Sequence, residues 1–484
     1  TTVTLDTPVT LGTLSVQDLT TASNSWIFAG TNSLTFDNGA SKPVLDILNR
    51  FPIISAPLVG TNGFSKTGPG AVTLSGDNSG LSGTLDLPNV AGTNSAGVTI
   101  AGTNALGSIN TINISGSTTT GQFLALSGTT TVGSGVTINL NSQGGNSAPS
   151  GGLRAEGTNS EIVTINGPVN VTLTGNAARI ANNSAKRLDI NGKITGTAGL
   201  TFRFGKNEGI HITNTGNTWS GTTVHSQEIL WFDPGSLPTT TNLQLCASGA
   251  GHVQTNGTFT RALGSAANQV QFTYNVGLWA QGFGARGGNL TLNFGGAGAD
   301  ILFDSTATGT AARIRTSTLV LNGGFADGNI TLVNPLDING AARTIQNSAL
   351  TATLQGGIKG GAFAVSKTGL GTLDLVTANT WTGDLTLPGN AGVVRLSHNE
   401  ALGPVATVKN VNTTGSNQII GLIELPGGIS IDENKTLRMG GKIFYGNAAA
   451  AIGDQSSLRS IGNNTWAGSA LIASTGGAYG IESV

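Results

Sequence analysis

Apolar and polar residues alternate in short runs along most of the chain. Within residues 365–387, Leu373 and Leu375 form one run, Leu385 and Leu387 form another, and a polar turn separates the two. A period of two is typical of a strand with one buried face. Each run is too short to bury a core by itself. We therefore expect strands of about 3–6 residues that stack on similar strands from other parts of the chain.

This stretch recurs elsewhere with variable spacing. Its first half, Ser-Lys-Thr-Gly-x-Gly, occurs at 65–70 and at 366–371. Its second half is a turn that combines Asn, an apolar residue and Gly, and four such turns are present: Asn78, Leu81 and Gly83; Asn217, Trp219 and Gly221; Asn379, Trp381 and Gly383; Asn464, Trp466 and Gly468. A second signature, Ala-Leu-Gly, begins at Ala105, Ala262 and Ala401. Degenerate repeats of this kind indicate a solenoid, in which each repeat stacks on its neighbours.

Together, the two halves resemble the autotransporter-associated β-strand repeat of bacterial surface proteins. The resemblance is close at 64–85 and 363–387 and partial at 199–224 and 462–471. It implies a parallel β-helix that is exposed outside the cell. It implies no particular chemistry, because the repeat is an architectural unit and function resides in sites placed on a fold.

We accordingly expect an all-β chain that forms a single-stranded, right-handed parallel β-helix, or β-solenoid, with loop excursions. Coils of about 20–25 residues would give roughly 20 coils. One continuous solenoid would comprise N-terminal strands or a cap at 1–60, a first repeat block at 61–200, an aromatic-rich middle block at 201–355 and a C-terminal repeat block at 356–484. Locally, Asn38-Gly39 predicts a turn after a strand, and 141–153 predicts a loop.

Composition narrows the possible functions. Charged residues are 10% of the chain, against about 25% in ordinary globular domains, and the formal net charge is -1. This balance gives no electrostatic reason to expect nucleic acid or an anionic membrane as a partner. The chain contains no run of 18 or more apolar residues, so we expect no membrane-spanning helix. The single cysteine, Cys246, cannot form an intrachain disulfide. The start at Thr1 fits a processed mature chain or an expression fragment.

Candidate chemistry is sparse. We find no nucleophile elbow, zinc-protease motif or phosphate-binding loop, and we expect no catalytic residue, cofactor or metal. The nearest carboxylate pairs are Asp300 with Asp304 and Asp432 with Glu433, and we expect the charged turn at 432–435 to be solvated. On a strand, Asp300 and Asp304 would lie about 13 Å apart, too far for paired acid–base work. Six basic residues form either a solvated face or a contact for an acidic glycan or other partner: Arg179, Lys186, Arg187, Lys193, Arg203 and Lys206.

Aromatic residues concentrate in the middle block. Trp231, Tyr274 and Trp279 are the candidates for stacking on sugar rings, for which tryptophan is well suited. The alternative is that the aromatic side chains of this block fill the interiors of the coils. Histidines and Cys246 in the same block lack the spacing of metal ligands, so a structural role is favoured over a zinc site.

Three functions follow from these patterns. The first is an extracellular structural protein, a β-helical rod that acts as a surface spacer or a self-assembling fibre subunit. Both ends of the chain alternate like strands, so end-to-end or terminal-strand assembly with itself is expected. The second is an adhesin that binds glycans or partner surfaces through the middle block. The third is an enzyme that acts on polysaccharides, which would need carboxylates gathered from different coils.

Overall fold

The computed structural model divides the chain into two compact units, Thr1–Leu243 (unit 1) and Gln244–Val484 (unit 2). It describes residues 1–18, 26–49, 51–90, 96–116, 121–144, 151–173, 178–246, 249–273, 279–296, 298–304, 312–338, 340–388, 391–404, 409–413, 421–439, 457–472 and 481–484. Within these ranges there is no helix, and therefore none long and apolar enough to cross a membrane.

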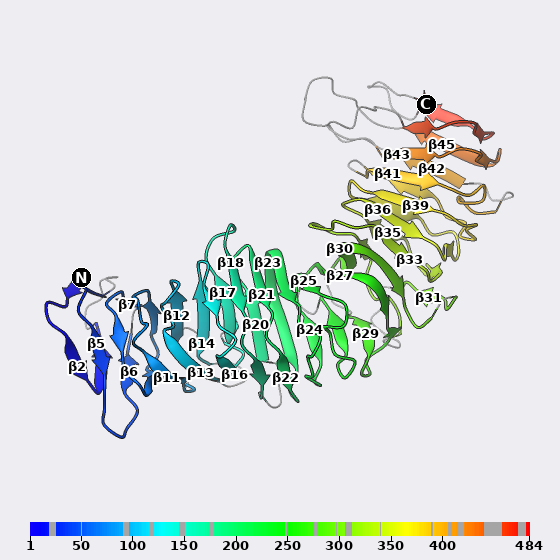
Figure 1. Cartoon of the computed structure of the whole chain (residues 1–484). Helices are drawn as coiled ribbons and strands as arrows, with labels where there is room; N and C mark the ends of the chain where they lie inside the picture. The colour runs from blue at the N-terminus through cyan, green and yellow to red at the C-terminus, as the bar shows by residue number, and fades with distance from the viewer. Residues whose placement is uncertain are drawn as a thin grey trace. The chain divides into compact units, whose positions relative to one another are not determined.

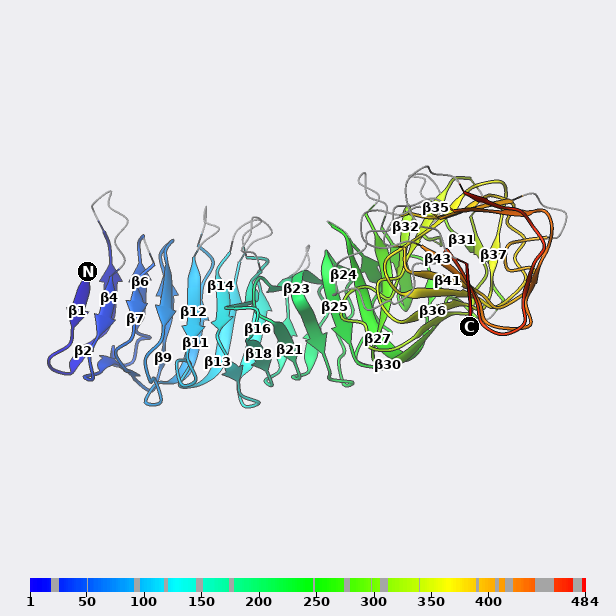
Figure 2. The same cartoon turned by 90° about the horizontal axis from the view of Figure 1, so that it is seen from above.

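Parallel ladders of short strands build unit 1, which confirms the expected all-β parallel solenoid fold (Figures 1 and 2). The first ladder contains β1 (Thr2–Thr4), β4 (Ile27–Ala29), β7 (Ile53–Ile54), β10 (Ala71–Leu74), β12 (Gly97–Ala101), β14 (Phe123–Ser127), β17 (Leu153–Glu156), β20 (Ala178–Asn182), the start of β23 (Leu200–Ile212) and β24 (Thr223–His225). The second contains β3 (Thr13–Val16), β6 (Val44–Ile47), β9 (Gly63–Thr67), β11 (Ser82–Leu87), β13 (Ser108–Ser115), β16 (Thr137–Asn141), β19 (Val169–Val171) and β22 (Ile194–Gly196).

Two shorter ladders complete unit 1. One contains β2 (Val9–Leu11), β5 (Leu34–Phe36) and β8 (Leu58–Val59). The other contains β15 (Thr131–Val132), β18 (Ile162–Ile165), β21 (Arg187–Ile190), the end of β23 and β25 (Glu228–Phe232). Strand β26 (Leu243–Leu245) lies at the boundary of the two units.

Unit 2 repeats the same arrangement. The long strands β27 (Gly251–Thr260) and β30 (Gln281–Asn293) pair in parallel and start two ladders. One continues through β32 (Thr318–Leu321), β35 (Arg343–Gln346), β38 (Val365–Thr368), β40 (Leu385–Leu387), β42 (Lys409–Thr413), β45 (Lys435–Met439) and β48 (Ala470–Ile472). The other continues through β33 (Ile330–Leu332), β36 (Thr351–Leu354), β39 (Thr372–Leu375), β41 (Val393–Leu396), β43 (Leu422–Leu425), β46 (Leu458–Ser460) and β49 (Ile481–Ser483).

Three groups of short strands complete the described part of unit 2. They are β28 (Ala262–Leu263) with β29 (Gln269–Phe272), then β31 (Ile301–Leu302) with β34 (Leu336–Asp337) and β37 (Ile358–Lys359), and finally β44 (Ser430–Ile431) with β47 (Thr465–Trp466).

The core is a set of apolar columns that run from strand to strand. In the first ladder of unit 1, Leu124 pairs in register with Leu153, Leu153 with Ile180, and Ile180 with Phe202. These side chains are at most 1% exposed. Because each residue of a column packs on its counterpart in the next coil, burying one such side chain stabilises the fold by about 1.5–3 kcal/mol.

The coils are less uniform than we expected. Hydrogen bonds between neighbouring coils join residues that are 20, 27 or 31 positions apart in unit 1, and 40 apart in one part of unit 2. The expected coil of 20–25 residues is therefore too short for several coils. The predicted turn at Asn38-Gly39 and the predicted loop between β16 and β17 are confirmed for the described residues. The hand of the winding stays a prediction.

Some strands are also longer than predicted, because they continue from one ladder into another. Strand β23 spans 13 residues. Its start pairs with β20 and its end with β21, and the register shifts between Gly205 and Ile210. A Cβ on Gly205 would lie 2.0 Å from the carbonyl oxygen of Ile229. Glycine therefore allows the close approach of the next strand where β23 passes from one ladder to the other.

Candidate functional site

The asparagine of the repeat turn joins neighbouring coils. In Asn78, Oδ1 accepts a hydrogen bond from the backbone N–H of Leu58 at 2.8 Å, and Nδ2 donates to the carbonyl oxygen of Ala105 at 2.6 Å. Leu58 lies 20 residues earlier in the chain and Ala105 lies 27 residues later. The Asn78 side chain is fully buried. Its amide thus satisfies one backbone group in the coil before and one in the coil after.

The same arrangement recurs at two further turns. Asn217 accepts from the N–H of Ile194 at 2.7 Å and donates to the carbonyl of Ser236 at 2.8 Å. Asn379 accepts from the N–H of Ile358 at 2.5 Å and donates to the carbonyl of Ala401 at 2.6 Å.

The fourth asparagine is arranged differently. Asn464 accepts from the N–H of Ile429 at 2.9 Å and donates to the carbonyl of Leu425 at 3.2 Å, so both of these contacts reach back to one earlier segment. Three of the four turns therefore bridge two coils through a single side chain, and the fourth ties its own turn to a preceding coil.

Two copies of the Ala-Leu-Gly signature take part in these contacts. The carbonyl groups of Ala105 and Ala401 are the acceptors for Asn78 and Asn379, which lie 27 and 22 residues earlier. The signature at Ala262 lies in β28 instead. Two of the three copies thus supply the partner of a bridging asparagine in the preceding coil.

The apolar residue enters the core in three of the four turns. Trp219 and Trp381 are 0% exposed and Leu81 is 1% exposed, whereas Trp466 is half-buried. The indole Nε1 of Trp219 donates to Thr223 Oγ1 at 2.8 Å, which satisfies its polar atom inside the coil.

The glycine of each turn lies where neighbouring backbone leaves no room for a side chain. A Cβ would lie 2.7 Å from Asn62 C at Gly83, 2.2 Å from Gly199 N at Gly221, 1.9 Å from the Phe363 oxygen at Gly383 and 1.7 Å from the Lys435 oxygen at Gly468. Real Cβ contacts do not approach below 3.0 Å. Each turn therefore requires glycine for packing of backbone against backbone.

The lysine of the repeat lies inside the coil. Lys66 and Lys367 are 0% exposed and occupy positions in register with the core residues Leu45 and Ile345. Each ammonium group is held by carbonyl oxygens of its own turn: those of Gly68 and Gly70 for Lys66, and those of Gly369 and Gly371 for Lys367.

Burial lowers the pKa of both lysines to about 7. The carboxylate of Asp46 acts in the opposite direction at Lys66, and the carbonyl of Ala391 is a third acceptor for Lys367. The Ser-Lys-Thr-Gly-x-Gly half of the repeat is therefore a turn closed around its own lysine.

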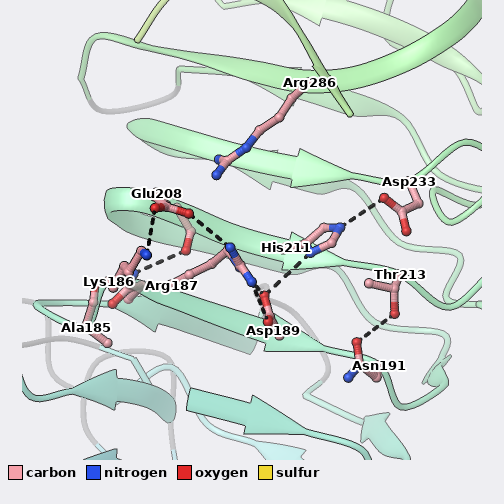
Figure 3. A network of polar contacts seen from close by, with 12 residues as sticks. Ala185, Lys186, Arg187, Asp189, Asn191, Glu208, His211, Thr213, Asp233 and Arg286 are labelled. Carbon is pink, nitrogen blue, oxygen red and sulfur yellow. Dashed lines mark hydrogen bonds and ion pairs between the residues drawn. The ribbon is translucent and has the colours of Figure 1, made fainter. Parts of the chain in front are cut away.

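A charged network lies on β21 and β23 of unit 1, with Lys186 directly before β21 and Asp233 directly after β25 (Figure 3). Glu208 binds Lys186 at 3.4 Å and Arg187 at 3.0 Å, and Arg187 also contacts Asp189 through Nε at 2.5 Å. His211 lies between two carboxylates, with Nδ1 3.5 Å from Asp189 and Nε2 2.9 Å from Asp233. The network joins side chains from successive coils and pairs two of the six predicted basic residues with acids.

This environment shifts the ionisation of the network. Burial acts to raise the pKa of Asp189, but hydrogen bonds from His211 and Arg187 outweigh it, and the pKa is lowered. The hydrogen bond to Asp189 raises the pKa of Arg187. Asp189 is therefore an ionised partner in an ion pair, and a poor general acid.

The three aromatic candidates for ligand stacking have different surroundings. Trp231 is half-buried, and the His211 ring stacks on one of its faces with the ring centroids 3.4 Å apart at 5°. That face is therefore covered by protein. Trp279 is half-buried, and its carbonyl accepts a hydrogen bond from Thr316 at 2.6 Å. Tyr274 lies outside the described residues.

The two carboxylates of the predicted pair Asp300 and Asp304 have different cationic partners. Asp300 pairs with Lys359 at 2.7 Å, whereas Asp304 is buried and pairs with Arg313 and, at 3.8 Å, with Arg343. Among the described residues, no group of three His, Cys, Asp or Glu side chains could hold a metal ion. We predicted that the charged turn at 432–435 is solvated, and this prediction is wrong for Lys435. Its side chain is 1% exposed, because Nζ donates to the carbonyl of Pro404 inside the coil.

Sequence reasoning missed several asparagines that bond neighbouring backbone. In unit 2, Asn334 accepts from the N–H of Phe294 at 2.7 Å, and Asn322 accepts from the N–H of Ala285 at 2.8 Å. Both asparagines directly follow an alternating apolar run. This position could have identified them, because it is where the strand ends and the chain turns toward the next face. The buried lysines gave no such signal, because a lysine in an alternating run is normally assigned to the solvent side.

Comparison with known proteins gives no relative: no family model, curated protein or solved structure matches this chain.

Proposed function

We propose that this chain is a structural segment of a bacterial surface protein, in which a parallel β-solenoid acts as a spacer. The observation that carries the proposal is that the recurring residues have structural roles. The asparagine bridges neighbouring coils, the tryptophan packs in the core, the glycine allows close backbone packing, and the lysine closes its own turn. A chain whose recurring side chains are buried in this way keeps its geometry without supplying chemistry.

The expected location outside the cell is part of this proposal. It rests on the resemblance of 64–85 and 363–387 to the autotransporter-associated repeat, together with the low charge content of 10%. Small polar side chains such as Thr and Asn suit outward columns of a parallel stack, because like charges in register would repel. Asn139 illustrates this, since it donates to Asn113 at 2.7 Å in the coil before it.

Imaging of the purified protein tests the spacer. Negative-stain micrographs, together with the maximum dimension from small-angle scattering, should show elongated single particles whose length does not depend on concentration. Filaments that lengthen with concentration would instead favour the fibre-subunit form of the proposal, in which the partner is the chain itself. Compact particles with a nearly spherical envelope would contradict both forms.

A further inference from the structure

Three exposed apolar side chains lie at one corner of unit 2. At this corner, successive coils pass from one ladder to the other: from β32 to β33, from β35 to β36, and from β38 to β39. Each of these turns carries one large apolar residue in contact with solvent. Phe325 is 53% exposed, Leu350 is 47% exposed and Leu370 is 48% exposed. We call these three side chains the corner ridge.

Hydrogen bonds show that the three turns stack in succession. The N–H of Ser348 in the second turn donates to the carbonyl of Asn322 in the first at 2.8 Å. The N–H of Thr372, after the third turn, donates to the carbonyl of Leu350 in the second at 2.8 Å. Neighbouring strands of a sheet lie about 4.7–4.9 Å apart, so the corner presents one such turn about every 5 Å.

The backbone of the ridge is unfavourable for the residues that it carries. Phe325 has a φ of 63° and Leu350 a φ of 51°, which is the left-handed region. That region favours glycine, and a residue with a side chain adopts it at an energetic cost. In the third turn Gly369 takes this conformation, with a φ of 80°, and Leu370 follows it. All three turns thus keep an exposed apolar side chain, two of them under strain, and such strain points to a function.

A column of small polar side chains runs beside the ridge. Asn329 directly precedes β33, Thr351 begins β36 and Thr372 begins β39. Thr351 is in register with Thr372, and its N–H donates to Asn329 Oδ1 at 3.0 Å. Asn329 is exposed and the two threonines are half-buried. Each of the three coils therefore offers one apolar side chain and one amide or hydroxyl.

The surroundings of the ridge favour a narrow, uncharged ligand. The N–H groups of Thr351 and Thr372 are both bonded within the protein, so an extended peptide cannot add here as a strand. Three half-exposed side chains also offer far less area than the about 800 Å² per partner of a stable protein interface. The three turns carry one charged residue, the exposed Asp327, which would repel an anionic polymer.

We propose that the corner ridge and the polar column bind a neutral linear polysaccharide. A sugar ring has an apolar face of C–H groups and a rim of hydroxyl groups. The ridge contacts the ring faces, while the Asn329 amide and the two threonine hydroxyls bind the sugar hydroxyls.

The dimensions of the corner suit this ligand. The coil spacing of about 4.8 Å is close to the length of one sugar unit in an extended polysaccharide, so three turns cover about two or three units. The Arg286 guanidinium carbon lies 5.9 Å from the centroid of the Phe325 ring and restrains that ring. The site goes beyond the spacer role, which needs no ligand.

Calorimetry of the whole chain tests the proposal with three dissolved polysaccharides: a mixed-linkage β-glucan, a galactomannan and a polyuronide. At least one of the two neutral polysaccharides should bind, and added salt should leave its affinity unchanged, because no charged groups pair. Phe325→Asn with Leu350→Asn should weaken that binding about tenfold or more, because it removes an aromatic face and an apolar contact. Asparagine tolerates the left-handed conformation, so the melting temperature of this variant should not fall.

A matched control removes the same two residue types elsewhere. Leu48 and Phe51 of unit 1 are 36% and 59% exposed, and Leu48→Asn with Phe51→Asn should change the affinity less than about twofold. Leu370→Asn alone should give a loss between those of the two double variants.

Three results would overturn the proposal. The first is that neither neutral polysaccharide binds, or that the polyuronide alone does. The second is an equal loss of affinity in the two double variants. The third is self-association of the chain that Phe325→Asn with Leu350→Asn abolishes while no polysaccharide binds, which would assign the ridge to a contact between chains.

Discussion

Replacing Asn379 by alanine tests the bridging role of the repeat asparagine most directly. The substitution removes the acceptor of the Ile358 N–H, at 2.5 Å, and the donor to the Ala401 carbonyl, at 2.6 Å. Asn379 is 2% exposed, so water cannot replace these hydrogen bonds without opening the coil. A buried polar group left without a partner costs about 1–3 kcal/mol, and two such groups therefore give a destabilisation of about 2–6 kcal/mol.

Amide hydrogen exchange is the suitable assay, because it reports local opening in a chain of stacked coils that need not unfold in one step. The peptide containing Ile358 should exchange at least about 30-fold faster in the variant, which corresponds to about 2 kcal/mol. Asn463→Ala, at an exposed asparagine of the same unit, is the control and should leave exchange at Ile358 unchanged. Equal protection of Ile358 in the native chain and in Asn379→Ala would refute the bridging argument.

Three further outcomes follow from unit 2. Gly383→Ala should destabilise unit 2 by about 3 kcal/mol or more in urea unfolding, because a Cβ would lie 1.9 Å from the Phe363 oxygen. Gly324 has open space around it, so the control Gly324→Ala should change the free energy of unfolding by less than about 1 kcal/mol. Trp381→Ala, at a fully buried side chain, should cost about 3–5 kcal/mol, and a loss below 1 kcal/mol would contradict its place in the core. The pKa of Lys367 is about 7 in the folded chain, against an ordinary value of 10.5. Between these two pH values the unfolded chain therefore binds more protons than the folded chain. The free energy of unfolding should rise with pH across that window, by at most about 1.4 kcal/mol per pH unit. Lys367→Met should remove this part of the pH dependence, and an unchanged slope would show that the lysine titrates normally.

The alternation of single residues was enough to predict the fold. Leu373 and Leu375 stand on the buried side of β39, as a period of two requires, and the parallel stacking follows because no such strand can bury its face alone. Coil length could not be predicted in the same way. It depends on loop excursions, whose lengths leave the apolar period unchanged.

The side-chain contacts between coils could not be predicted from the sequence either, because the coil length varies. Arg187 and Glu208 are 21 residues apart, whereas Asn139 and Asn170 are 31 apart, although both pairs join adjacent coils. Without a constant repeat length, no fixed offset identifies the partner of a charged residue. Lys367 was hidden differently, because its place in the core depends on carbonyl groups of the following turn that composition does not reveal.

The bridging asparagine has a consequence for how such a chain can change its length in evolution. The amide of Asn78 binds one backbone group of the preceding coil and one of the following coil. Both coils must therefore place those backbone groups next to the Asn78 side chain. Duplication or loss of one complete winding preserves that match. An insertion of any other size must bulge out at a corner, so growth by whole windings is the route that leaves the interior intact.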